Sequence, residues 1–198
     1  MRKGKLEEIN SIIEKLKAKN IEKIEQDSNY ILIIPYKVIL NNDMVIYREK
    51  IIKGGTDGSP VVVLPILKDT NEIVIVIEPR VFTEKTVGIS TPAGYVDNNE
   101  DPLTAAIREL EEETGLKSNK IINIGDFYKD FGNASALSTQ FIAFDCEKTG
   151  KQHFDDDEMI DLVEVTLEEA NELIEMKYIR DACSIILINE ANRILKSN

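Results

Sequence analysis

Three glutamates, Glu109, Glu112 and Glu113, recur at helical spacing in one acidic segment of the chain. Glu109 and Glu113 are about one helical turn apart, so their carboxylates would lie on one flank of a helix. Such a pair repels, and near the end of a helix it also opposes the helix macrodipole. A divalent cation between the carboxylates would turn this repulsion into attraction, so the segment predicts a metal site. The alternative is a solvated acidic helix face, which is common in glutamate-rich helices.

A helix that could carry these carboxylates is predicted over Pro102–Thr114. Asp101 is a favoured N-cap residue, the proline after it suits the first helical position, and Gly115 can adopt the left-handed conformation that ends a helix. Arg108 stands one turn before Glu112 and can orient its carboxylate. Residues at three- and four-residue steps predict the face that turns to a core: Leu103, Ala106, Ile107, Leu110 and Thr114.

The spacing around this helix is more demanding than the acidic run alone. Its fixed positions run in the order Gly94, Glu100, Arg108, Glu109, Glu112, Glu113, Gly115. This pattern resembles the signature segment of the Nudix hydrolases, which cleave nucleoside diphosphates linked to another group, and every fixed position is filled. The resemblance implies the Nudix fold, an α/β (α+β) architecture in which a mixed β-sheet is sandwiched between helices.

The resemblance also implies a ligand set for the metal. The backbone carbonyl of Ala93 and the carboxylates of Glu109 and Glu113 would hold one ion, and Glu112 could hold a second or third. Mg²⁺ is the expected ion, with Mn²⁺ as the alternative, because Mg²⁺ prefers hard oxygen ligands and substrate phosphates.

A catalytic base is a further implication of the resemblance. In similar enzymes a glutamate on the loop before the last strand takes this role, and that position aligns with Glu158. The base would act with Arg108, Glu112 and Glu113, and the two aspartates before Glu158 are its substitutes. The ordinary meaning of such an acidic run is a charged loop.

Within the Nudix hydrolases the chain looks most like the ADP-ribose pyrophosphatases, from Tyr30 to the C-terminal helix. Four segments carry this narrower resemblance: 78–80, 92–94, 157–160 and 179–182. It implies cleavage of ADP-ribose or a related nucleoside diphosphate sugar to a nucleoside monophosphate and a sugar phosphate. The alternatives are hydrolysis of another derivative, such as GDP-mannose, and a non-catalytic nucleotide-sensing module. Departures from the usual pattern at Ser90-Thr91 and Gln140 indicate a different pocket lining.

Residues outside the signature are also expected to contact the substrate. Arg80 follows a predicted strand, and its guanidinium suits the geometry of a phosphate. Gly94, in the glycine loop before the helix, is assigned to the same binding site. Tyr30 and Tyr36, with Tyr47 as a third candidate, could stack on a base, since the chain has no tryptophan. The ordinary alternatives are a surface arginine and tyrosines that pack on a sheet.

Two parts of the chain are predicted, residues 1–53 and residues 54–198. The first part begins with an amphipathic helix over 5–19, which should dock on its own domain or on a partner subunit. Two β-rich segments, 29–40 and 44–52, follow and read as a hairpin. They form a small β-rich unit that would serve dimerisation and substrate binding. Strands of this kind exchange between subunits in the similar enzymes, so a homodimer is expected.

The second part is predicted to be the catalytic domain. Buried strands are expected over 61–67 and 72–78, and further strands over 121–128, 138–145 and 161–165. A capping box predicts a helix from Thr166 to Met176, and Asp181 should cap a final helix to about Leu195.

Composition excludes several classes of function. The net charge of -12 argues against broad binding to nucleic acids, because no basic stripe exists to contact phosphates. The chain also lacks a stretch apolar enough to span a membrane and the apolar run of a signal peptide, so a cytoplasmic location is expected. Cys146 and Cys183 lie in apolar segments and are predicted to be buried thiols.

Overall fold

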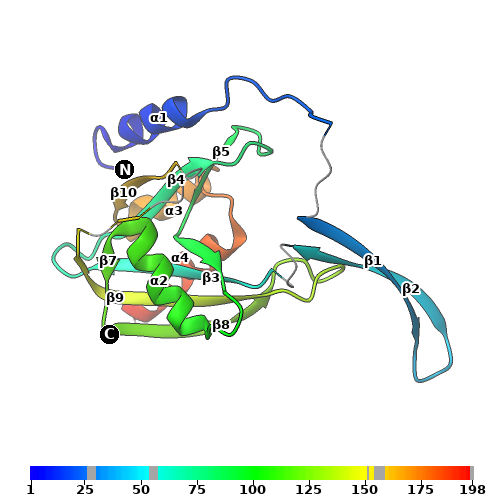
Figure 1. Ribbon diagram of the computed structural model, residues 1–198. Helices are drawn as coiled ribbons and strands as arrows, with labels where there is room; N and C mark the ends of the chain where they lie inside the picture. Colours follow the sequence, from blue (N-terminus) through cyan, green and yellow to red (C-terminus); the bar gives the residue numbers. More distant parts are fainter. Residues whose placement is uncertain (26–29, 54–57, 151, 154–158, 197–198) are drawn as a thin grey trace.

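The computed structural model describes residues 1–25, 30–53, 58–150, 152–153 and 159–196 (Figure 1). Four helices occur in these residues: α1 (Lys5–Leu16), α2 (Pro102–Thr114), α3 (Leu167–Glu175) and α4 (Ala182–Lys196). Ten strands accompany the helices within the same residues: β1 (Ile31–Ile39), β2 (Val45–Lys53), β3 (Pro60–Leu67), β4 (Ile73–Pro79), β5 (Val87–Ser90), β6 (Ala93–Tyr95), β7 (Leu116–Lys117), β8 (Lys120–Tyr128), β9 (Leu137–Lys148) and β10 (Asp161–Val165).

Eight of the strands form one mixed sheet. Its central order is β10-β4-β3-β9-β7, with β5 beside β4, β6 beside β3 and β8 beside β9. The β3–β9 pair is parallel, whereas the other pairings of this sheet are antiparallel. A mixed sheet between helices confirms the predicted fold.

The central strands are apolar on both sides because helices cover both faces of the sheet (Figure 1). Every residue of β3 is buried. Val61 and Val63 pack with α2 on one face, whereas Val62 and Leu64 pack with α1, α3 and α4 on the other. The continuous apolar run of β3 therefore divides between two cores.

The predicted helix ends are confirmed by their capping contacts. The Asp101 side chain accepts hydrogen bonds from the amides of Leu103 and Thr104, and Gly115 ends α2 with a φ of 63°. Thr166 and Glu169 form the predicted capping box of α3. These contacts satisfy backbone groups that the helices leave unpaired.

The predicted buried face of α2 is wrong in two positions. Leu103 and Ile107 are exposed, and Ala105 is buried in their place. Ala105 and Ala106 lie against the sheet together with Leu110, since small residues allow the helix to approach the strands closely. Local periodicity thus found the helix and three residues of its buried face, Ala106, Leu110 and Thr114, but missed Ala105.

Helix α1 docks on the same core as α3 and α4. Its buried residues Ile9, Ile13 and Leu16 belong to the core cluster on that face of the sheet. At its N-terminal end, Arg2 forms an ion pair of 2.6 Å with the buried carboxylate of Glu169. The structure thus groups α1 with the large sheet and not with the hairpin, while the division between residues 53 and 54 stays a prediction.

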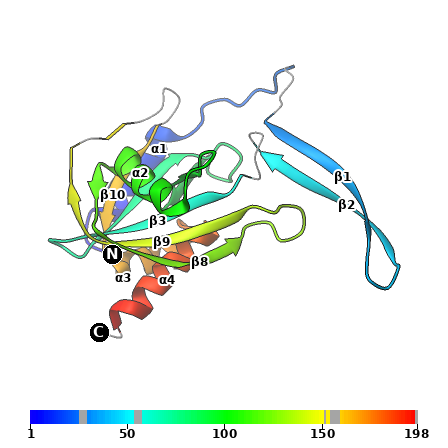
Figure 2. The same cartoon turned by 60° about the horizontal axis from the view of Figure 1, so that its bottom comes forward.

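The β1–β2 hairpin projects away from the large sheet in both views (Figure 1, Figure 2). Its two strands pair from Ile31 opposite Lys53 to Ile39 opposite Val45, so the predicted hairpin is confirmed. Many of its apolar side chains are exposed: Ile31, Leu32, Ile33, Tyr36, Ile39, Val45 and Tyr47.

Cys146 and Cys183 are buried free thiols, as predicted, and burial raises the pKa of Cys146 to about 11. Across the described residues, none of the helices combines the length and the apolar character needed to cross a bilayer.

Candidate functional site

The signature helix α2 brings two of its carboxylates against the short strand β6. The Ala93 amide donates a hydrogen bond of 3.0 Å to Oε2 of Glu113, a side chain that is almost fully buried. The Glu109 carboxylate lies directly over Gly94, where an added Cβ would sit 2.0 Å from its Cδ. Only glycine permits this approach of helix and strand. The glycine and the glutamate therefore form one structural unit although 14 residues separate them in the sequence.

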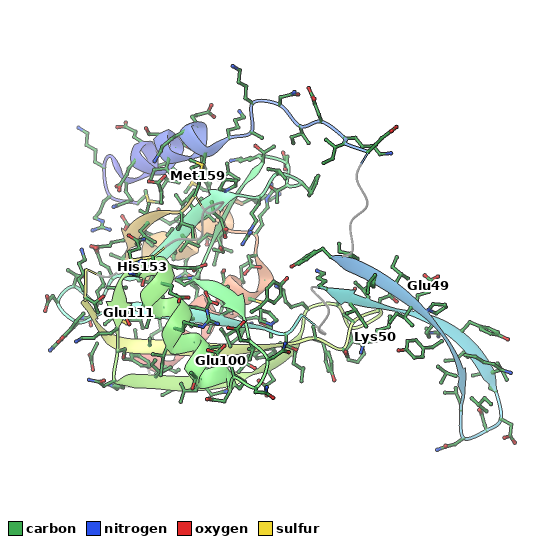
Figure 3. The ribbon with its side chains drawn as sticks, viewed as in Figure 1. Glu49, Lys50, Glu100, Glu111, His153 and Met159 are labelled. Carbon is green, nitrogen blue, oxygen red and sulfur yellow. The ribbon has the colours of Figure 1, made fainter. Side chains whose placement is uncertain are left out.

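Arg108 connects the acidic residues around this unit. Its Nη1 donates to Oε1 of Glu109 at 2.6 Å and to Oε2 of Glu112 at 3.0 Å. Its Nε and Nη2 donate to the two carboxylate oxygens of Glu100, and Nη2 also donates to the Tyr95 carbonyl. Glu100 lies at the N-terminal end of α2 (Figure 3). The predicted orientation of Glu112 by Arg108 is thus present in the structure.

These contacts perturb the protonation of both partners. Hydrogen bonds to Glu100, Glu109 and Glu112 raise the pKa of Arg108 above its ordinary value, with Glu100 contributing most. In return, Arg108 lowers the pKa of Glu100. The guanidinium and the Glu100 carboxylate therefore stay charged at neutral pH, so the network is held by charge-assisted hydrogen bonds.

The chemistry of the donor atoms suits a hard cation. Carboxylate oxygens and a backbone carbonyl are the ligands that Mg²⁺ accepts. Within the described ranges, however, no three acidic, histidine or cysteine side chains are grouped closely enough to hold a metal ion. Nη1 of Arg108 donates a hydrogen bond to each of Glu109 and Glu112, and its single positive charge offsets part of their negative charge. The predicted base, Glu158, falls outside the described residues.

A cavity of about 580 Å³ lies beside Ala93 and Gly94. Its size is that of a typical small-molecule site. The cavity is lined by β5 and β6, the loop between β4 and β5, and the connection between α3 and α4. Its charged lining consists of the cations Arg80, Lys85, Lys129, Lys177 and Arg180 and the acids Glu84 and Asp181. A protein with a net charge of -12 thus has a cavity whose lining carries an excess of cations, an arrangement that attracts anionic ligands.

The structure brings some of the predicted substrate residues to this cavity and leaves one outside it. Arg80 lines the cavity and forms an ion pair of 2.6 Å with Glu78. Tyr30 also lines it and donates a hydrogen bond of 3.2 Å to the Tyr95 hydroxyl, which raises the pKa of Tyr30. Tyr36 instead lines a separate hollow on the hairpin, next to Tyr47. Within one chain, Tyr36 is therefore not part of the cavity beside Ala93 and Gly94.

The sequence of this region matches a known domain. Residues 58–188, more than half of the chain, match the family profile described as the NUDIX domain. The chain belongs to the Nudix family. The matched region contains the whole of the large sheet and α2, so the fold and the signature helix described above are those of a Nudix domain.

Several individual relatives agree with the Nudix assignment. The chain is 36% identical over 115 residues to an ADP-ribose pyrophosphatase of Bacillus subtilis (strain 168), a match that covers 58% of this chain and 62% of that protein. It is 28% identical over 176 residues to a GDP-mannose pyrophosphatase of Salmonella typhimurium, covering 85% and 91% of the two chains. The crystal structure of an ADP compounds hydrolase superposes with a TM-score of 0.73 at 21% identity and covers 90% of this chain and 93% of its own. The match to the Bacillus subtilis protein spans less than two thirds of that protein's length.

Sequence reasoning missed several residues of the Nudix cavity. Lys85, Lys129 and Lys177 lie on segments that carry no recognisable motif, and only the folded chain brings them to the lining of one cavity. Arg180 belongs to one of the four segments that resemble ADP-ribose pyrophosphatases, so a signal for it existed. That signal indicated similarity but no role for the side chain.

Proposed function

We propose that this Nudix protein is a divalent-metal-dependent hydrolase of nucleoside diphosphate sugars, with ADP-ribose or a close relative as substrate. The observation that carries the proposal is the contact of Glu109 and Glu113 with Gly94 and Ala93, two residues that line a cavity rich in cations. Hard oxygen donors beside cationic side chains suit a substrate that is a metal-bound diphosphate. The name of the Bacillus subtilis relative supports ADP-ribose as the first substrate to test.

The proposed reaction adds one water molecule across the diphosphate. The water oxygen attacks one phosphorus, the bond between that phosphorus and the bridging oxygen breaks, and the bridging oxygen leaves with the other phosphate. From ADP-ribose the products are AMP and ribose 5-phosphate. When bound, Mg²⁺ or Mn²⁺ would neutralise the diphosphate and make a water more acidic.

The protein's own residues have separate parts in this proposal. The Ala93 carbonyl and the carboxylates of Glu109 and Glu113 would hold the ion, with Glu112 as an auxiliary ligand. Arg108 orients Glu109 and Glu112 through the hydrogen bonds described above.

Substrate contacts lie on the other walls of the cavity. Arg80 would donate to phosphate oxygens, because a guanidinium presents paired N–H groups to them. Tyr30 would contact the base, since its ring lines the same cavity. Glu158 is proposed to take the proton from the attacking water on the strength of the sequence resemblance.

GDP-mannose is the second candidate substrate. The Salmonella typhimurium relative named as a GDP-mannose pyrophosphatase matches this chain over 91% of its length, a longer match than that to the Bacillus protein. A non-catalytic nucleotide sensor remains the candidate from a different functional class. An assay of hydrolysis and binding with both compounds separates the ADP-ribose hydrolase, the GDP-mannose hydrolase and the sensor.

The decisive experiment is hydrolysis of ADP-ribose and GDP-mannose by the purified protein with Mg²⁺, with nucleoside monophosphate release followed by chromatography. Glu113→Gln should keep the acceptor for the Ala93 amide but lower kcat/KM by roughly 100-fold or more, since even outer-shell residues of metal sites cost 10–100-fold. Chelation with EDTA should abolish turnover. Tight binding of either compound without any hydrolysis would support the sensor and refute the hydrolase.

We also infer that the protein is a homodimer formed through the β1–β2 hairpin. The exposed apolar side chains of both strands support the inference, because a second copy of the hairpin could remove them from water. In a dimer, Tyr36 could reach the cavity of the partner subunit, which would reconcile its predicted role with its position outside the cavity of its own chain.

A further inference from the structure

One wall of the cavity is made by two segments that are far apart in the sequence. These are the β4–β5 loop, residues 80–86, and the α3–α4 connection, residues 176–181. Nη1 of Arg180 forms an ion pair of 2.7 Å with Oε2 of Glu84. Nζ of Lys85 lies 4.0 Å from the centre of the Tyr178 ring. These two contacts hold the segments together as one surface, called here the cationic wall.

The backbone of the cationic wall has two unusual conformations. Among the described non-glycine residues with a positive φ, most are asparagine or aspartate, which tolerate this region: Asp43, Asn71, Asn99 and Asp145. The others are Thr86, with a φ of 58°, and Lys177, with a φ of 62°, and both belong to the cationic wall. Strained residues of this kind tend to collect at ligand sites.

Lys177 is the more informative of the two. It follows Met176, the C-cap of α3, at a position where helices commonly place glycine. A glycine would adopt the left-handed conformation without strain, so the backbone gives no reason for a lysine here. Its side chain lines the cavity, where a charged ligand could use it.

Charge is concentrated at the same place. The pKa of Glu84 is lowered first by its hydrogen bond with Arg180 and further by the nearby charges of Lys85 and Lys177. The charged residues of the cationic wall are the cations Arg80, Lys85, Lys177 and Arg180 and the acids Glu84 and Asp181. The excess of two positive charges matches a phosphate monoester, which carries close to two negative charges at neutral pH.

We propose that the cationic wall binds a phosphate group that the substrate carries in addition to the diphosphate that is cleaved, and that Lys177 is the residue that selects such substrates. The scissile diphosphate would lie near Ala93 and Gly94, and a neutral sugar beyond it would not need this excess of positive charge. The proposal rests on the function proposed above and narrows the substrate to phosphorylated nucleoside diphosphate sugars.

The test measures binding with turnover blocked, by isothermal titration calorimetry in EDTA. The ligands are ADP-ribose, ADP-ribose 2′-phosphate and ADP-ribose 1″-phosphate, so the two phosphorylated compounds identify which ribose carries the group. We expect the unsubstituted protein to bind one phosphorylated compound roughly tenfold or more tightly than ADP-ribose, the gain of a charge-assisted hydrogen bond. Lys177→Gly should remove most of this preference, and Lys177→Arg should restore it.

Two controls keep the result clear. Lys177→Gly should not lower the Tm, because glycine suits the left-handed backbone. Lys117→Ala removes an exposed lysine from β7, which does not line the cavity, and should leave the ligand preference unchanged. Equal affinity of the unsubstituted protein for all three ligands would overturn the proposal, as would a preference that survives Lys177→Gly. If either result overturned the proposal but the protein still hydrolysed ADP-ribose with Mg²⁺, the proposed function would remain intact. A Lys177-dependent preference without any hydrolysis would instead refute the hydrolase and leave the phosphate site standing.

Discussion

Gly94 lies so close to the Glu109 carboxylate that no larger residue fits at this position without a displacement. Substitution by alanine would place a Cβ 2.0 Å from Cδ of Glu109, so the carboxylate must move or β6 must shift. A displacement of about 1 Å at a catalytic group can cost roughly 100-fold in rate. We expect Gly94→Ala to lower kcat/KM for the preferred substrate by about that factor.

The matched control for Gly94 is Gly132→Ala. An added Cβ at Gly132 would meet only Oδ1 of Asp130, at an ordinary distance of 3.6 Å. Steady-state kinetics of the two variants should therefore differ, with Gly132→Ala close to the unsubstituted protein. Equal activities would show that Glu109 tolerates displacement and is not a metal ligand.

Gln140 presents a different problem, because its side chain is fully buried in β9 and has no hydrogen-bond partner among the residues that the structure describes. A buried polar group left unpaired costs about 1–3 kcal/mol. We expect Gln140→Met, which has a similar length, to raise the free energy of unfolding by about 1 kcal/mol, and Gln140→Glu to lower it because a charge would be buried. Urea unfolding measures both. A less stable Gln140→Met protein would mean that the amide is hydrogen-bonded to a buried water.

At the scale of elements, the docking of α1 depends on an ion pair that responds to pH. Hydrogen bonds from Arg2 lower the pKa of Glu169 from 4.5 to about 2. A carboxylate whose pKa is lower in the folded than in the unfolded state stabilises the fold above its unfolded pKa. This stabilisation is complete above about pH 4.5 and is lost as the pH falls towards 2.

Arg2→Ala should therefore lower the Tm by a few degrees at neutral pH, and the difference from the unsubstituted protein should shrink between pH 4.5 and pH 2. Lys3→Ala, a charge change at the exposed neighbouring residue, is the control and should have little effect. Thermal unfolding across this pH range measures the difference. A Tm difference that does not change with pH would show that Arg2 acts through packing and not through Glu169.

At the scale of the whole molecule, the hairpin decides how two chains could associate. Ile33 on β1 is 61% exposed and lies among the other exposed apolar side chains of the hairpin. A charge placed there would have to be buried in a dimer, which is costly. We expect a dimeric mass for the unsubstituted protein at micromolar concentration and a monomeric mass for Ile33→Glu, by analytical ultracentrifugation.

Leu195→Glu provides the control for the dimer experiment, since Leu195 is 41% exposed at the end of α4 and lies on a different element. It should remain dimeric. The hairpin is not the interface if the unsubstituted protein is monomeric or if Ile33→Glu stays dimeric. In either case Tyr36 could not reach the cavity of a partner subunit in this way.

Local sequence determined the helix that carries the chemistry. The cap at Asp101, the stop at Gly115 and the spacing of Glu109 and Glu113 are all present as predicted, because capping and helical periodicity act over a few neighbouring residues. The same rules placed Ala106, Leu110 and Thr114 correctly on the buried face of α2 but not the two other residues predicted there. Leu103 and Ile107 are exposed because the position of the sheet, and not the helix, decides what is buried.

Only the tertiary structure decided what surrounds the glutamates. Gly94 and Glu109 meet because β6 pairs with β3 while α2 packs over both strands. The cationic wall exists because the β4–β5 loop and the α3–α4 connection, about 95 residues apart in the chain, meet at one end of the sheet. The sequence thus determined the chemical groups and their local spacing, and the packing of distant segments decided which of them share a cavity.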